Sequence, residues 1–179
     1  MWFDIVNRFT FEHVFAGEAA SLKELVELAV EQGRNLAEAN LMGADLAGAN
    51  LRNAKMTRIY LFGANLAGAI LENANLSDAK ISKADLTAAN LRGANLPSAN
   101  LHRAVLIGAD LTGANLHSVD LIGANLRDAK LVSTNLTGAF LTRADLTGAD
   151  LTDAQLTRAE TFLTKGLKPR TWGLESAAG

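Results

Sequence analysis

The sequence predicts an all-β solenoid, because three features recur with a period of five residues. From Leu36 to Leu156 every fifth residue is aliphatic; 23 of these 25 positions hold leucine, and Met56 and Ile81 are the exceptions. Alanine stands two residues before such a position at 22 of 25 places between residues 39 and 159. Asparagine or aspartate follows that alanine at 16 of 25 places. The repeating unit is therefore Ala-Asn/Asp-Leu-x-x.

This period excludes the common helical and straight-strand patterns. Five residues turn an α-helix by about 500°, so successive leucines would drift around every side of it. The order alanine, polar residue, leucine is locally extended, with alanine and leucine directed inward and the polar residue outward. The two remaining positions, often ending in glycine, predict a corner. One side and one corner per unit predict a coil that closes after four units, about 20 residues, so that the 25 units form about six coils.

The repeats resemble those of the pentapeptide repeat family. Ala44-Asp45-Leu46-Ala47-Gly48 and Ala144-Asp145-Leu146-Thr147-Gly148 match that family's motif, and the match covers residues 36–160. The resemblance implies a right-handed quadrilateral β-helix with four pentapeptides per coil. Asparagines 75, 95, 115 and 135 would then stack as a ladder. Thr134, the one polar inward residue, is expected to hydrogen-bond to local backbone.

Residues 1–35 are expected to cap the open N-terminal end of the solenoid, where backbone groups lack partners. Residues 9–15 alternate as a short strand. A helix is predicted near residues 21–33, because Ser21 and Glu24 form a capping box and Gly33 ends the segment. Its apolar stripe (Leu22, Leu25, Val26 and Ala29) can cover the first coil.

Residues 161–179 are expected to form a C-terminal cap or tail. The segment is apolar enough to cover the last coil or to meet a second copy of the chain. The family resemblance implies a homodimer through this end, and the expected contacts are Phe162, Leu163, Leu167, Trp172 and Leu174.

The sequence offers no group that suggests catalysis, a metal or a cofactor. It has no cysteine, which excludes disulfides and thiolate chemistry. Among the three histidines, His102 and His117 are 15 residues apart and so lie on different faces of the coil. The glycines recur at the corner position and form no phosphate-binding loop. We therefore expect no catalytic, metal or cofactor site.

The charge and hydropathy of the chain argue against nucleic acid and membrane as partners. The net charge is −2, and no apolar run is long enough to span a bilayer. The N-terminal residues show neither a basic start nor an apolar signal region, so a soluble, cytoplasmic location is expected.

One outward face departs from the polar pattern. Residues 20 apart should stack, which places Met42, Phe62 and Ile122 in one row and Tyr60 and Phe140 in the row beside it. These five residues are the candidate partner-binding residues, since exposed apolar patches mark interaction sites.

Two functions are compatible with this sequence. The first is a non-catalytic structural or protein-interaction module with an unidentified protein partner. The second is a DNA-mimicking modulator of type II topoisomerase, an activity found in the family. Residues 36–160 contain 12 acidic and 11 basic residues and no interrupting loop, and they have no central phenylalanine, all of which disfavours mimicry.

Overall fold

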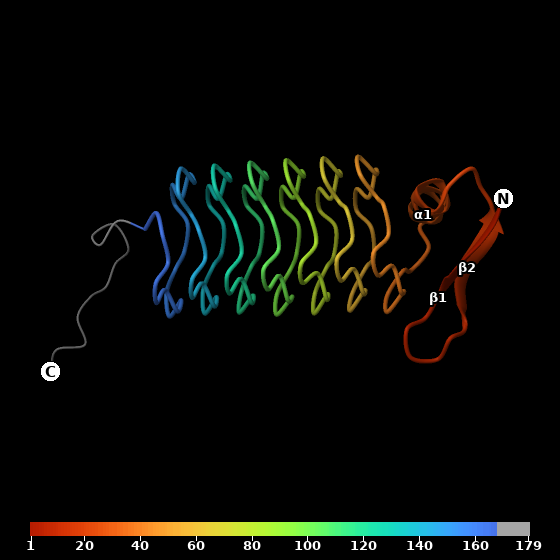
Figure 1. Ribbon diagram of the computed structural model, residues 1–179, viewed down its shortest axis with the longest axis horizontal. Coiled ribbons are helices and arrows are strands. Elements are labelled where there is room, and N and C mark those ends of the chain that lie inside the picture. The colour runs from red at the N-terminus through yellow and green to blue at the C-terminus, as the bar shows by residue number, and fades with distance from the viewer. Residues whose placement is uncertain (168–179) are drawn as a thin grey trace, which may run out of the picture.

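The computed structural model describes residues 1–167, and its main body is a stack of coils along one axis (Figure 1). Parallel β-bridges join residues 20 apart without interruption, from Asn35 with Lys55 to Asp145 with Lys165. One coil is therefore four pentapeptides, as the period predicts. The strand segments are single bridges and not long strands, because a corner interrupts the chain in every unit.

Hydrogen bonds satisfy all five N–H groups of a typical unit, as residues 101–105 show. The N–H groups of Leu101 and Arg103 donate to carbonyls of the following coil, those of Asp120 and Ile122. The N–H of Val105 donates to the preceding coil, and that of Ala104 closes the corner onto Leu101 O. The fifth N–H, that of His102, donates to the side-chain Oδ1 of Asn100 at 3.0 Å.

This last bond explains the preference for asparagine and aspartate. In 15 of the 16 units with Asn or Asp at this position, its Oδ1 accepts the N–H two residues ahead. The exception is Asn95, which is followed by Pro97, a residue with no N–H to donate. The predicted ladder is confirmed: the side chains of Asn115 and Asn135 donate to Asn95 and Asn115 at 2.9 and 3.1 Å, and Asn95 to Asn75 at 3.5 Å.

The second corner residue has a positive φ in every unit from Glu38 to Leu163. With the hydrogen bond from the alanine N–H to the leucine carbonyl, this is the pattern of a type II turn. Ten of these 26 residues are glycine, while the other 16 have a side chain and adopt the same left-handed backbone. The corner is thus imposed by the coil, and glycine is only the least strained residue there.

The inward leucine and alanine rows form one continuous core, buried from Leu36 to Leu146. Thr134 is fully buried in this core, and its hydroxyl donates to Leu111 O at 2.8 Å. The prediction of a backbone partner is confirmed, but the prediction that it is local is wrong, because Leu111 belongs to the preceding coil. Thr164 repeats the arrangement with Leu141 O at 2.7 Å.

The N-terminal cap consists of a hairpin and one helix (Figure 1). Strands β1 (Trp2–Val6) and β2 (His13–Glu18) pair antiparallel, and α1 spans Leu22–Glu31 with Ser21 as its N-cap. The prediction of a single strand over residues 9–15 is wrong. The side chain of Asn7 accepts the N–H groups of Phe9 and Thr10, which turns the chain into a loop before β2 begins.

Charged side chains of α1 complete the hydrogen bonding of the first coil. The ammonium of Lys23 donates to Ala47 O at 2.8 Å, and the carboxylate of Glu27 accepts from Asn50 N–H at 2.8 Å. The hairpin supplies a third partner, because Asn40 N–H donates to Val6 O at 2.9 Å. These contacts replace those that a preceding coil would make.

The coil geometry extends one unit beyond residue 160, through residues 161–165, which the sequence assigned to the tail. Leu151 and Leu156 in the last coil are half-buried, whereas Leu146 is buried. Leu167 packs against the core as a partly buried residue. Two of the expected end contacts, Trp172 and Leu174, lie outside the described residues.

Candidate functional site

The candidate site is one of the four faces of the coil, here called the aromatic face. It comprises three rows of outward residues: 40, 60, 80, 100, 120, 140 and 160; 42, 62, 82, 102, 122, 142 and 162; and the corner residues 43, 63, 83, 103, 123, 143 and 163. All four aromatic residues of the coil, Tyr60, Phe62, Phe140 and Phe162, belong to it. The first two rows alternate with buried leucine and alanine, so the coil holds these side chains outward.

At the N-terminal end of this face, aromatic rings and cations stack in a row. The rings of Tyr60 and Phe62 lie 6.4 Å apart and are nearly parallel. The guanidinium of Arg8 lies 3.7 Å from the Tyr60 ring and 5.4 Å from that of Phe9, while the Lys83 ammonium lies 5.3 Å from the Phe62 ring. Such cation–π contacts contribute about 0.5–1 kcal/mol at exposed sites. The cap loop therefore extends the aromatic face.

A second apolar cluster lies at the C-terminal end of the same face. It consists of Ile122, Phe140 and Phe162; Phe140 is 37% exposed and Phe162 is 69% exposed. Phe162 follows Thr142 in its row, because residues 161–165 continue the coil. The sequence had assigned Phe162 to an end contact; the structure places it on the aromatic face.

The two clusters are separated by polar side chains. Ser82 donates a hydrogen bond to the side chain of Asn100 at 2.6 Å, and His102 lies 4.0 Å from Asp120. The five candidate residues named from the sequence are therefore not one patch. Met42, Tyr60 and Phe62 form one end, and Ile122 and Phe140 belong to the other.

The aromatic face also holds four cations, Lys80, Lys83, Arg103 and Arg143, against two carboxylates, Asp120 and Glu160. Within residues 1–167, none of these four cations forms an ion pair. On the other faces Arg52 pairs with Glu72 at 2.8 Å, and Arg58 pairs with Glu38 across adjacent coils. Four further cations of the coil, Lys55, Arg127, Arg158 and Lys165, also form no ion pair within residues 1–167 and lie on other faces. The aromatic face therefore holds half of the coil's cations that form no ion pair, beside all of its aromatic rings.

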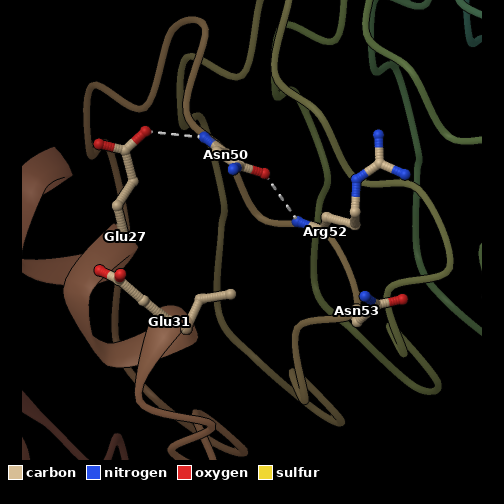
Figure 2. A pocket seen from close by; sticks show the side chains of 6 residues that line it. Glu27, Glu31, Asn50, Arg52 and Asn53 are labelled. Carbon is tan, nitrogen blue, oxygen red and sulfur yellow. Dashed lines mark hydrogen bonds between the residues drawn. The ribbon is translucent and has the colours of Figure 1, made fainter.

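A hollow between α1 and the first coil is the other place where polar groups converge (Figure 2). Glu27, Glu31, Asn50 and Arg52 line it. The carboxylate of Glu27 accepts from Asn50 N–H and so joins α1 to the first coil. The guanidinium of Arg52 pairs with Glu72 and so joins the first coil to the second. In the described part of the chain there is no cluster of three His, Cys, Asp or Glu side chains suited to a metal.

The comparisons identify the family of this coil. The family model for pentapeptide repeats matches in eight copies, over residues 32–61, 59–96, 84–123, 99–138 and 124–160. The chain belongs to the pentapeptide repeat family. Among curated proteins, none matches this pentapeptide repeat protein.

Solved structures of pentapeptide repeat proteins share the fold. One, from the thylakoid lumen of Arabidopsis thaliana, is 32% identical with a TM-score of 0.51; the match covers 52% of this chain and 65% of the other. A second, trypsin-treated QnrB1, a plasmid-mediated fluoroquinolone resistance protein, is 18% identical with a TM-score of 0.57 over 72% of this chain and 78% of that one. This pentapeptide repeat protein therefore spans less than two thirds of the Arabidopsis chain.

No helix among residues 1–167 is long and apolar enough to cross a membrane.

Two parts of the aromatic face were not expected from the sequence: Arg8 with its neighbour Phe9, and the terminal Phe162. A continuation of the five-residue register to residue 162 would have found the last of these. The cap residues have no periodic signal, because they reach the face through a loop.

Proposed function

We propose that this protein is a non-catalytic protein-binding module and that its aromatic face is the binding surface. The observation that carries the proposal is that all four aromatic side chains of the coil lie on one of its four faces. Aromatic residues and arginine are enriched at the energetic centres of protein interfaces. The continuous apolar core keeps this face flat and rigid, so little conformational freedom is lost on binding.

Affinity capture from the source organism tests this proposal. The triple variant Tyr60→Ser, Phe62→Ser and Phe140→Ser should lose the partner that the unmodified chain retains. The matched control changes three outward apolar residues of other faces, Ile70, Ile107 and Val132, to serine. Ile107 is as exposed as Phe140, at 36% against 37%. Retention of every partner by the aromatic triple variant would remove the aromatic face from the proposal.

The second part of the proposal is a homodimer through the C-terminal end. Leu151 and Leu156 are only half-buried there, and the coil ladder points N–H groups toward a following coil. Sedimentation should give a dimer for the unmodified chain and a monomer for Leu156→Arg. A chain that stays monomeric at every concentration would contradict this part.

Topoisomerase modulation by DNA mimicry gains no support from these faces. Mimicry requires continuous negative charge, whereas the aromatic face carries an excess of two cations and the other faces contain paired cations. The likeness to QnrB1, at 18% identity, is one of fold. We expect no change in gyrase supercoiling at micromolar protein. The right-handed twist of the coil and a cytoplasmic location remain predictions, the first from the family resemblance and the second from the sequence.

A further inference from the structure

The aromatic face has a charge and shape that specify the kind of segment it would bind. Its two apolar clusters lie at opposite ends, and between them stand the cations Lys80, Lys83 and Arg103. The side chain of Arg103 extends over the next corner, with its Cγ 3.5 Å from where a Cβ on Gly123 would lie. Positive charge therefore spans the gap between the clusters.

We propose that the aromatic face binds an extended acidic segment of a partner protein with an apolar side chain at each end. This inference rests on the proposed function and adds the chemistry of the partner. One apolar side chain would contact Met42, Tyr60 and Phe62. The other would contact Ile122, Phe140 and Phe162. Side chains of an extended segment alternate between its two sides, so the acidic residue midway between the two apolar ones would face the cations directly, and the acidic residues beside it would add longer-range attraction.

The coil spacing sets the length of this segment. Phe62 and Ile122 are three coils apart in one row, which is about 14 Å at a strand spacing of about 4.8 Å. An extended chain rises about 3.3 Å per residue, so the second apolar position comes about four residues after the first, with about three residues between them. The bound segment would run along the axis and across the coils, so side chains and not a β-ladder would hold it.

A protein segment fits this face better than a nucleic acid does. The excess of two positive charges is small for a nucleic acid, which carries a negative charge at every nucleotide, and is enough for a segment with a few carboxylates. Met42 and Ile122 offer contact area but no ring on which a base could stack. Apolar side chains with intervening carboxylates complement both features.

Nuclear magnetic resonance titration of the full chain tests the proposal, because amide shifts detect weak binding and show where it occurs. The probe is a capped peptide of five residues, with leucine at each end and three glutamates between. We expect shifts confined to the aromatic face and the cap loop. The same peptide with glutamine for glutamate should bind about fivefold more weakly, and added salt should reduce the difference.

Charge reversal on the protein gives the matched test. Lys83→Glu with Arg103→Glu should weaken the acidic peptide at least about fivefold. The control, Arg127→Glu with Arg158→Glu, makes the same charge change at exposed positions of other faces and should leave binding within about twofold. Unchanged circular dichroism shows that each variant folds.

The outcomes separate this inference from the proposed function. Equal binding of the acidic and glutamine peptides on the aromatic face would overturn the charge preference and leave the binding surface in place. No shift with any peptide would overturn the inference, while the capture experiment still decides the proposed function. Tighter binding of a thymidine oligonucleotide than of the acidic peptide would overturn both, because the face would then be a nucleic-acid surface.

Discussion

Ala88 and Gly108 allow a direct measurement of what the left-handed corner costs. They occupy the same corner of adjacent coils, with φ of +56° and +64°. Each N–H donates to the next coil, Ala88 to Ile107 O at 2.8 Å and Gly108 to Arg127 O at 2.9 Å. A Cβ on Gly108 would meet no atom within 4 Å. Gly108→Ala therefore adds backbone strain to the folded chain without a steric clash.

The expected magnitude follows from two opposing terms. A left-handed backbone costs a residue with a Cβ about 1–2 kcal/mol relative to glycine. Replacing glycine also restricts the unfolded chain, which offsets about 0.4–1 kcal/mol of this cost. Gly108→Ala should thus lower the free energy of unfolding by about 1 kcal/mol, and Ala88→Gly should raise it by a similar amount. In a chain of this size 1 kcal/mol moves Tm by about 2–4 °C.

Thermal and urea unfolding followed by circular dichroism measure both changes. The double variant measures how strongly the two stacked corners are coupled, because the N–H of Ala88 donates to the carbonyl of Ile107, next to Gly108. Gly166→Ala is the contrasting control: its Cβ would overlap the backbone of Leu146 and Thr147, which cannot turn aside as a side chain can, so it should cost more than Gly108→Ala. A neutral or stabilising Gly108→Ala together with a destabilising Ala88→Gly would refute the reasoning.

Three further predictions follow from the hydrogen bonds. His117 precedes a corner as Pro97 does, and its N–H bonds only to the Asn115 side chain. His117→Pro should therefore shift Tm by no more than about 2–4 °C in thermal unfolding. Asn115→Pro instead removes the backbone hydrogen bond from Asn115 N–H to the preceding coil and should cost about 3 kcal/mol. Glu27→Ala should speed hydrogen exchange at Asn50, measured by mass spectrometry, while Glu31→Ala leaves it unchanged. The hydroxyls of Thr147 and Thr152 donate to Asp145 and Asp150 and lower the pKa of both carboxyls below the ordinary 3.8. The stability they contribute is present above that value and is lost as the pH falls through the lower folded pKa, so Thr147→Val with Thr152→Val should flatten the decline of Tm on acidification. An unchanged pH profile would count against this assignment.

The repeat could be predicted from the sequence because its information is local and redundant. Every unit repeats the same pattern of inward and outward residues, so the core rows and the asparagine ladder could be predicted from the spacing alone. The role of the asparagine side chain toward the N–H two residues ahead did not follow. It depends on the corner geometry, which the coil as a whole imposes.

The hairpin could not be predicted in the same way. The alternation over residues 9–15 is typical of a strand, yet the Asn7 side chain takes the N–H groups of Phe9 and Thr10 and forms a loop. Strand β1, with Ile5 buried, was missed because five residues give too short a pattern to distinguish. No periodic signal marks where a cap segment meets the coil.

The sequence by itself determined the solenoid, its two inward rows and the register that aligns residues 20 apart, because a period of five with a fixed inward pattern has few other ways to bury its leucines. Only the tertiary structure decided what lies on the aromatic face. The contact of Arg8 with Tyr60 joins residues far apart in the chain, and Phe162 reaches the face because the coil continues past the last leucine. Such contacts depend on how the cap docks and where the coil ends, which are packing outcomes that local spacing does not encode.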